Sequence, residues 1–570
     1  MKLTGAQIVM ECLLEQEVEV VFGYPGGTIL NLYDALYDYR DRIRHILTSH
    51  EQGASHAADG YARATGKVGV CFSTSGPGAT NLVTGIATAY MDSSPVVLIT
   101  CNVASNLIGR DSFQEIDITG VTMPITKCNY QVRDIRKLAD VIREAFAVAA
   151  SGRPAPVLID IMKDVTTQTA EFTFLPRSAH GSDAHIARLL RRKAIIINSP
   201  EPDAEKIAMA ADWIRAAERP MFVIGGGVVS ADASACMRRL AALVNAPVAS
   251  TLLAKGVLSF DDPLSTGLIG MHGTKLSNLA FVEADLIIAI GARFTDRVAL
   301  NPEKFRDGKR IVQIDIDASE INKNVRVDLG IVSDAKKAIE ALLAELGDSF
   351  EKKPNWAAPI VPAAPGERAR TETELLNPAE ILDAIYSATG DNVIIATDVG
   401  QHQIWTAQHF KISRPRQLIT SAGFGTMGFG LGAAMGAKVG RPDSVVVAIT
   451  GDGSFRMNLT ELSTIEYYDI PVITVIFNNQ TLGMVRQWQT LLYHRRYSET
   501  TLDRGPDFVK VADAFGIAGK RVAKLPEFRS AFAEALASGK AALIECMIDI
   551  DEKVVPMVPG GKHLNDFLID

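Results

Sequence analysis

The sequence predicts an α/β protein with three domains, each built on a mainly parallel sheet flanked by helices. Three observations predict this fold class. The chain has 570 residues, more than a single hydrophobic core supports. Short β-branched runs alternate with segments of helical spacing in three separate blocks, and polar or proline-rich stretches divide the blocks. Such alternation is typical of parallel βαβ units, whose ligand sites lie at the carboxyl ends of the strands.

The first block is expected to form a domain over residues 1–165. Its strand-like runs are 18–22, 46–48, 68–73 and 96–100. The polar stretch 166–202 follows and is expected to be a linker. It contains four clustered basic residues: Arg188, Arg191, Arg192 and Lys193. They could bind an anion, but a solvated linker is the simpler interpretation.

Two further blocks complete the expected domain organisation, and no sequence repeat relates any of the three. The second block is expected over 203–350, with strand-like runs at 221–224, 286–290 and 311–316. A proline-rich connection, 351–374, leads to the third block at 375–550. The strand-like runs of the third block are 393–397, 445–450, 472–477 and 542–548. The tail, 551–570, resembles a flap more than a core element.

The composition favours a protein that acts on small molecules. The net charge is -8 and the basic residues are scattered, which disfavours nucleic-acid binding. No apolar run approaches the length of a membrane span. Acidic residues interrupt any signal-peptide core near the start, so we expect a cytoplasmic protein, with a processed organellar precursor as the alternative. The six cysteines are dispersed without a Cys-x-x-Cys pair, which argues against a zinc site and a disulfide framework.

The strongest chemical signal is Gly451-Asp452-Gly453 after one buried strand and Asn478-Asn479 after the next. Between them, Asn458 is expected to cap a helix, with Glu461 completing an arrangement like a capping box. Parallel strands would then bring Asp452 and Asn479 into one crevice, where their oxygens suit Mg²⁺. A diphosphate would supply the missing oxygens. The tripeptide alone is an ordinary turn, and it is the spacing to Asn-Asn that favours a metal and diphosphate site.

This pattern resembles the signature of thiamine-diphosphate enzymes, and nearly the whole chain resembles the acetohydroxyacid synthase (acetolactate synthase) family. The resemblance implies the fold of pyruvate oxidases and decarboxylases, with a pyrimidine-binding domain first, an FAD-binding-like domain in the centre and a diphosphate- and Mg²⁺-binding domain last. It is carried by Tyr24-Pro25-Gly26-Gly27, Ser75-Gly76-Pro77-Gly78-Ala79-Thr80-Asn81, Phe113-Gln114-Glu115, Val399-Gly400-Gln401-His402-Gln403 and Gly483-Met484-Val485-Arg486-Gln487-Trp488.

The same resemblance implies a role for four groups of residues. The catalytic residues would be Glu51, Gly27 and Gln114, with the Glu51 carboxylate on N1′ of the aminopyrimidine. The metal ligands would be Asp452, Asn479 and the backbone carbonyl of Thr481, and the substrate residues Phe113, Lys163, Arg297 and Trp488. Thiamine diphosphate would contact Glu51, Pro25, Val399, Gly400, Gln401, His402, Gly425, Met427, Asp452, Gly453, Ser454, Asn479, Leu482, Gly483 and Met484. FAD would contact Arg153, Gly226, Thr251, Leu252, Met271, His272, Gly291, Arg293, Asp296 and Asp315.

Several of these residues also have a purely structural explanation. Glu51 would otherwise cap the next helix, and Lys163 would be a solvated lysine after a strand. Arg297 would form a surface salt bridge with Asp296, and Trp488 would pack in a core. The central domain could retain its fold without flavin, because Gly225-Gly226-Gly227 does not fulfil the dinucleotide fingerprint. Two positions depart from the family pattern: Thr295 replaces the usual aspartate, and Ala104 replaces a proline at the channel entrance.

The resemblance implies an enzyme of valine, leucine and isoleucine biosynthesis. It would decarboxylate pyruvate on thiamine diphosphate and transfer the two-carbon unit to pyruvate or 2-ketobutyrate, with Mg²⁺ and FAD also bound. A homodimer or a dimer of dimers, and a separate small regulatory subunit, are expected as well. The alternatives are a catabolic acetolactate synthase, a pyruvate oxidase, another 2-ketoacid decarboxylase and a non-enzymatic homologue. Arg293, Arg297 and Trp488 favour the biosynthetic enzyme, and Glu51, Asp452 and Asn479 argue against a non-enzymatic one.

Overall fold

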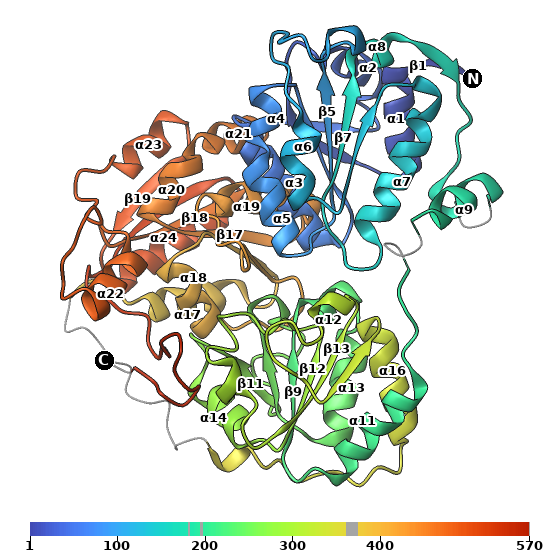
Figure 1. The fold of residues 1–570 in the computed structure, drawn as a ribbon. Coiled ribbons are helices and arrows are strands. Elements are labelled where there is room, and N and C mark those ends of the chain that lie inside the picture. The colour runs from blue at the N-terminus through green and yellow to red at the C-terminus, as the bar shows by residue number, and fades with distance from the viewer. Residues whose placement is uncertain (181–182, 194–197, 361–373, 569–570) are drawn as a thin grey trace.

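Three domains, each with a six-stranded parallel sheet, make up the computed structural model, which describes residues 1–180, 183–193, 198–360 and 374–568. The predicted fold class is therefore confirmed. In Figure 1 the N-terminal domain (blue to cyan) and the C-terminal domain (orange to red) lie side by side, and the central domain (green to yellow) lies below both. Among the described residues, no helix has both the length and the apolar character needed to cross a membrane.

The N-terminal domain and the segment after it contain these elements: β1 (Lys2–Thr4), α1 (Gly5–Glu15), β2 (Val20–Tyr24), α2 (Leu30–Tyr39), β3 (Arg44–Leu47), α3 (Glu51–Thr65), β4 (Gly69–Ser73), α4 (Pro77–Asn81), α5 (Val83–Met91), β5 (Val96–Asn102), α6 (Ile118–Thr122), β6 (Cys128–Val132), α7 (Leu138–Ala150), β7 (Val157–Met162), α8 (Lys163–Thr167), β8 (Thr169–Glu171) and α9 (Ala184–Arg191).

The central domain contains α11 (Ala204–Ala216), β9 (Pro220–Ile224), α12 (Gly226–Ser230), α13 (Ser234–Val244), β10 (Val248–Ser250), β11 (Ser265–Leu268), α14 (Lys275–Glu283), β12 (Leu286–Ile290), α15 (Pro302–Phe305), β13 (Arg310–Asp315), β14 (Leu329–Val332) and α16 (Ala335–Leu346). The C-terminal domain contains α17 (Pro378–Thr389), β15 (Val393–Thr397), α18 (Gln401–His409), β16 (Leu418–Thr420), α19 (Phe429–Gly440), β17 (Val445–Gly451), α20 (Asp452–Asn458), α21 (Leu462–Tyr467), β18 (Val472–Asn478), α22 (Gly483–Leu492), α23 (Phe508–Ala514), β19 (Ala518–Val522), α24 (Leu525–Ser538) and β20 (Ala542–Met547).

The first and last domains share one sheet topology although their sequences show no repeat. The strand order is β3-β2-β4-β5-β7-β6 in the first and β16-β15-β17-β18-β20-β19 in the last, with all neighbours parallel. The strand order reverses between β2 and β4 in the N-terminal sheet and between β15 and β17 in the C-terminal sheet. Ligands of open α/β sheets bind outside the carboxyl ends of the strands at such a switch point.

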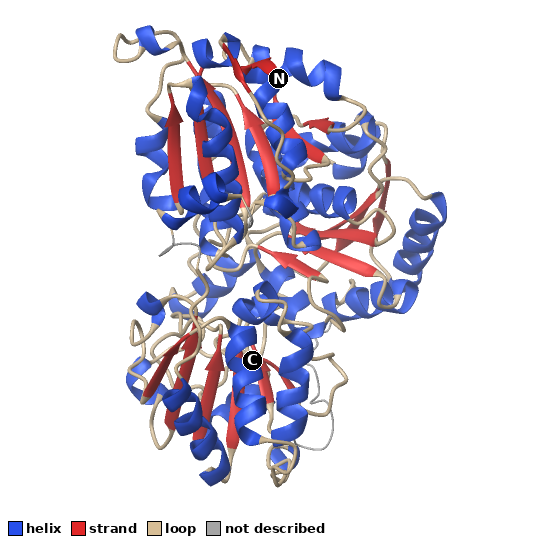
Figure 2. Ribbon diagram, turned by 90° about the vertical axis from the view of Figure 1, so that its right-hand side faces the viewer, coloured by secondary structure: helices blue, strands red, loops and turns tan. Residues whose placement is uncertain are grey.

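The central sheet has the order β11-β10-β9-β12-β13-β14, which is the six-strand order of dinucleotide-binding folds. Its switch point lies between β9 and β12. All five residues of β12 are buried, because helices cover both faces of the sheet, as Figure 2 shows for the sheets of this chain. This explains why a continuous apolar run predicted the strand.

Helices α3 and α19 join the N-terminal and C-terminal domains by direct contact of their backbones. Gly60 of α3 lies against Ala433, and Gly436 of α19 lies against Ala57. A Cβ atom on Gly436 would stand 1.8 Å from the carbonyl oxygen of Ala57. Only glycine permits this approach, so the relative position of the two domains depends on these small residues.

Two segments are more ordered than the sequence indicated. Within the expected linker 166–202, β8 pairs antiparallel with β1, and α9 follows. In the expected flap, Met557, Val558 and Leu564 are buried in a core cluster of the central domain, so part of this segment belongs to that core. Of the expected connection 351–374, residues 361–373 lie outside the described part of the chain.

We expect Gly436→Ala to lower the midpoint of thermal unfolding. Alanine improves helix propensity by about 1 kcal/mol, but overpacking against a backbone carbonyl typically costs about 1 to 3 kcal/mol and outweighs that gain. Gly560→Ala is the matched control, because a Cβ at that position meets nothing within 4 Å. Equal midpoints for the two variants would show that the α3–α19 contact adapts to a methyl group.

Candidate functional site

Asp452 is a buried carboxylate at the switch point of the C-terminal sheet. It follows β17 directly as the first residue of α20, and it is 2% exposed. Its Oδ2 atom is buried and has no hydrogen-bond partner among the described residues. Burial raises the pKa of Asp452 to about 7, although the charge of Arg456 opposes the shift. A buried carboxylate oxygen without a partner is costly, and a bound cation would satisfy it.

Asn479 lies beside Asp452 at the end of the neighbouring strand, as predicted from the parallel topology. Its side-chain nitrogen donates to Oε1 of Gln401 over 3.1 Å, so its oxygen is the atom it would offer a cation. Gln401 in turn donates to Gln487 over 3.0 Å. A Cβ on Gly483 would stand 1.9 Å from Oε1 of Gln401, so this network requires glycine at 483. Thr481 is buried in the same turn.

Asn458 is the N-cap residue of the short 3-10 helix Leu459–Glu461, as predicted, but its side chain makes no capping hydrogen bond. Helix α20 begins at Asp452 and ends at Asn458, whose amide donates to the carbonyl of Gly428 over 2.6 Å. Glu461 completes no capping box. Its carboxylate accepts the backbone N–H groups of Ser49 and His50, in the N-terminal domain. A local capping pattern contains no information about such a distant partner.

The loop after β15 closes the same end of the C-terminal sheet. Ser454 donates its hydroxyl to the carbonyl of Val399 over 2.9 Å, and Gly400 is the N-cap of α18, with φ 152°. Burial lowers the pKa of His402 to about 3, and this ring packs against Gly451. Other residues that the resemblance assigned to thiamine diphosphate lie close by. Gly453 lies against Leu482 and near Met427. Gly425 and Met484 line the cavity described below.

Glu51 is the first residue of α3, in the N-terminal domain, and it does not cap the helix. The cap is His50, whose Nδ1 accepts the N–H of Gln52. The Glu51 carboxylate instead accepts a hydrogen bond from Asn81 over 2.9 Å and lies against Gly78. It is 8% exposed.

Other predicted residues lie at the same end of the N-terminal sheet, around the ends of β2 and β4. Lys163 is exposed and donates to the carbonyl of Gly27 over 3.1 Å, which is compatible both with a place in the site and with a solvated lysine after a strand. The backbone of Gln114 packs on Gly76, while the neighbouring Phe113 is 87% exposed. Pro25 directly follows β2.

A cavity of about 730 Å³ opens at the switch point of the central sheet. All ten residues that the resemblance assigned to FAD line it. Gly225 and Gly227 lie against the backbone of Gly291, which brings the ends of β9 and β12 together. Burial raises the pKa of Asp315 to about 6 and lowers that of His272 to about 4, and Nδ1 of His272 has no partner in the described structure.

The cavity extends to the C-terminal domain, where Val399, Gly400 and Met484 line it. Arg297 and Trp488 line it as well. Arg297 also forms the ion pair with Asp296 that was its structural alternative, at 3.2 Å and with 65% of its side chain exposed. Trp488 is half-buried and packs against the core cluster that contains Met271.

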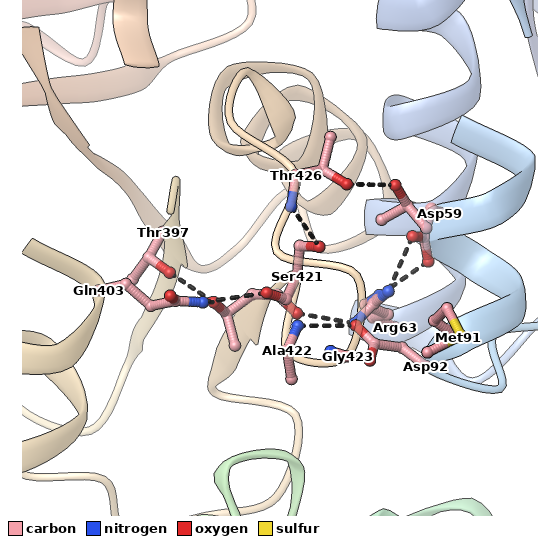
Figure 3. A network of polar contacts seen from close by, with 12 residues as sticks. Asp59, Arg63, Met91, Asp92, Thr397, Gln403, Ser421, Ala422, Gly423 and Thr426 are labelled. Atoms are coloured by element: carbon pink, nitrogen blue, oxygen red, sulfur yellow. Dashed lines mark hydrogen bonds and ion pairs between the residues drawn. The ribbon is translucent and has the colours of Figure 1, made fainter. Parts of the chain in front are cut away.

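The sequence did not predict that residues 91–93, the end of α5 and the turn after it, contact both other domains beside this cavity. Asp92 accepts the N–H groups of Ala422 and Gly423, at 2.9 and 2.7 Å. Figure 3 shows this carboxylate between the loop after β16 and Arg63, which donates to it over 2.9 Å. On the other side, the carbonyl of Met91 accepts a hydrogen bond from Arg293, and the Ser93 hydroxyl accepts one from Arg153.

The predicted catalytic residues do not line this cavity. None of Gly27, Glu51 and Gln114 is among the residues that line it, and neither are Asp452, Asn479 and Thr481. The predicted residues therefore form three groups, at the end of the N-terminal sheet, at the end of the C-terminal sheet, and around the cavity between the central and C-terminal domains.

Comparisons with known proteins match all three domains. Residues 3–121, 207–342 and 398–546 match the N-terminal TPP binding domain, the central domain and the C-terminal TPP binding domain of thiamine pyrophosphate enzymes. The chain is 46% identical to a probable acetolactate synthase large subunit of Methanocaldococcus jannaschii, over 99% of this chain and 95% of that protein. It is 44% identical to the acetolactate synthase large subunit of Parasynechococcus marenigrum (98% and 90% covered) and 40% identical to that of Haemophilus influenzae (100% and 98%).

We expect Gly483→Ala to displace the Gln401 side chain and, with it, the amide of Asn479. The affinity for thiamine diphosphate with Mg²⁺ should fall about 10- to 100-fold, as is typical when a group that orients a metal ligand is lost. Binding is measured by calorimetric titration. Gln401→Ala removes the nearest obstructing atoms and leaves only the side-chain nitrogen of Asn479, 2.7 Å from the added Cβ, so Gly483→Ala should cost less in the Gln401→Ala background than on its own. Fully additive losses would contradict this explanation.

Proposed function

We propose, on the premise that this chain belongs to the acetolactate synthase large subunits within the thiamine pyrophosphate enzymes, that it decarboxylates pyruvate and transfers the two-carbon unit to pyruvate or 2-ketobutyrate. The observation that carries the proposal is the buried Oδ2 atom of Asp452, which lacks a partner and lies beside Asn479 at the switch point of a thiamine pyrophosphate-binding domain. This is the environment that a metal-bound diphosphate would complete.

Asp452, Asn479 and the carbonyl of Thr481 would hold Mg²⁺. No three His, Cys, Asp or Glu side chains gather as a metal site in the described ranges, so a cation at Asp452 would also need phosphate oxygens. Gly453 and Ser454 in the first turn of α20, and Gly400 at the N-cap of α18, would surround the diphosphate. Gln401 would act indirectly, by orienting Asn479.

Glu51 would hold the aminopyrimidine ring and control a proton on it. When bound, thiamine diphosphate supplies a carbon nucleophile for the ketone and an acceptor for the electron pair released with carbon dioxide. Glu51 suits its part because its carboxylate is buried and is oriented by Asn81, which leaves it one further oxygen to engage N1′. Phe113, Gln114 and Lys163, near the same strand ends, would border the pyruvate pocket.

A homodimer would complete the site. Glu51 begins α3 in the N-terminal domain and Asp452 begins α20 in the C-terminal domain, and neither lines the cavity of about 730 Å³. We propose that a second copy brings its C-terminal domain to the N-terminal residues. Large apolar side chains exposed on the N-terminal domain support such an interface: Tyr24, Leu30, Phe113 and Met123. A separate small regulatory subunit is proposed because the relatives are named large subunits.

The cavity of about 730 Å³ would hold FAD. Its position at the switch point of a sheet with dinucleotide-binding strand order supports this, as do the glycine contacts of Gly225, Gly227 and Gly291. The net reaction transfers no electrons, so the flavin would have a structural role. We further propose the domain limits 1–165, 203–350 and 375–550.

The acceptor would be bound by Arg297 and Trp488. A guanidinium group binds a carboxylate through two parallel hydrogen bonds, and Arg297 forms an exposed ion pair with Asp296, which it can exchange for the ketoacid. The half-buried indole of Trp488 supplies a rigid apolar wall for the extra methyl group of 2-ketobutyrate.

The direct test of the proposed reaction is product analysis. With thiamine diphosphate, Mg²⁺ and FAD, pyruvate should give 2-acetolactate, and added 2-ketobutyrate should give 2-aceto-2-hydroxybutyrate. Peroxide with acetyl phosphate would identify an oxidase, and free acetaldehyde a simple decarboxylase. Either result would overturn the proposed function.

We expect Glu51→Gln to slow hydrogen–deuterium exchange at C2 of bound thiamine diphosphate by orders of magnitude. The amide has nearly the same shape but carries no charge for N1′, and general acid–base contributions of this kind are about 100- to 10,000-fold. Cofactor binding should largely persist, which titration checks. Asn81→Ala is a useful comparison and should have a smaller effect, since it only orients the carboxylate. A Glu51→Gln enzyme with normal exchange would assign Glu51 a purely structural role.

We expect Trp488→Leu to keep the fold and acetolactate formation while losing most of the preference for 2-ketobutyrate. The two acceptors differ by one methylene, and a shaped pocket discriminates this by about 1 to 3 kcal/mol, or roughly 10- to 200-fold. A competition assay with both ketoacids measures the product ratio, alongside thermal stability. An unchanged ratio in a stable variant would exclude Trp488 from the specificity pocket.

A further inference from the structure

The turn that presents Glu51 is held by the C-terminal domain of the same chain. Glu461 is fully buried, and its Oε1 accepts the N–H of His50 over 3.1 Å while its Oε2 accepts the N–H of Ser49 over 3.2 Å. Nearby, the hydroxyl of Tyr468 accepts the N–H of Leu47 over 3.0 Å. The peptide groups immediately before α3 are thus fixed by side chains from residues 461–468.

Glu461 is itself held in one position. Thr464 donates its hydroxyl to Oε2 over 2.7 Å. On the other side lies Gly53, where a Cβ atom would stand 2.0 Å from Oε1. Burial raises the pKa of Glu461, and the three donated hydrogen bonds act in the opposite direction. A buried carboxylate is expensive unless it is hydrogen-bonded, and here each oxygen accepts at least one hydrogen bond.

We propose that Glu461 is a positioning residue for Glu51. Glu51 is the first residue of α3, so the two peptide groups that Glu461 holds set the direction in which its side chain leaves the backbone. An error of about 1 Å in the position of a reacting group can cost on the order of 100-fold in rate. This inference rests on the role proposed above for Glu51.

The test uses the enzyme loaded with thiamine diphosphate and Mg²⁺. Glu461→Gln keeps the shape but turns an NH₂ group toward one of the two backbone N–H groups. Exchange at C2 should slow about 10- to 100-fold, while cofactor affinity stays close to that of the unaltered enzyme. In the ligand-free protein, the peptide containing residues 47–52 should exchange its amide hydrogens faster, which reports on the turn without any turnover.

Ser463→Ala is the matched control. Ser463 lies at the same domain contact and bonds the hydroxyl of Ser49 over 2.6 Å, but it makes no bond to the N–H groups that Glu461 holds. Exchange at C2 of the bound thiamine diphosphate should be unchanged in the Ser463→Ala variant. If Glu461→Gln fails to fold, Thr464→Val offers a milder change that removes one support of the carboxylate and should slow exchange partially.

A double variant separates this inference from the proposal beneath it. If Glu461 acts through Glu51, Glu461→Gln should slow C2 exchange no further in a Glu51→Gln background. Normal exchange in folded Glu461→Gln, or an equal loss in Ser463→Ala, would overturn the positioning role while leaving that of Glu51 intact. Normal exchange in Glu51→Gln alone would instead remove the role of Glu51, and the inference with it.

Discussion

The contact between α3 and α19 is the constraint on which the rest of the structure depends. Because Gly60 and Gly436 let the two backbones touch, the N-terminal and C-terminal domains pack as if they were layers of one core. This proximity allows Glu461 to reach the turn before Glu51, and Asp92 to reach the loop after β16. The polar contacts between the two domains therefore depend on the close helix packing that these glycines permit.

The segment 452–461 serves two different sites under the proposed dimer. At its start, Asp452 would bind the metal ion of a site completed by the partner subunit's N-terminal domain. At its end, Glu461 holds the turn of its own chain's N-terminal domain. One short stretch, α20 with the turn after it, would thus determine geometry in both sites of a dimer, and a shift of α20 would change the two sites together.

The sequence predicted what depends on local pattern and on topology. Strands with continuous apolar runs, such as β12 and β18, were predicted within a residue or two because burial on both faces demands that composition. Strands of three residues, such as β10 and β16, are too short to show a pattern. Asp452 and Asn479 were predicted to converge because parallel strands end at one edge. The partners of Glu461 and Asp92 were not predicted, since they lie hundreds of residues away and only the docked domains bring them together.

Residues 91–93, at the end of α5 and in the turn after it, link all three domains beside the cavity. They belong to the first domain to be synthesised, yet their hydrogen-bond partners are Arg293 in the second domain and Ala422 and Gly423 in the third. The cavity is also lined by Met484 and Trp488, so its walls are complete only after residue 488 has been synthesised. Ligand binding then stabilises the docked arrangement of all three domains by mass action, so the concentration of ligand in the cell would influence how much of the protein survives folding.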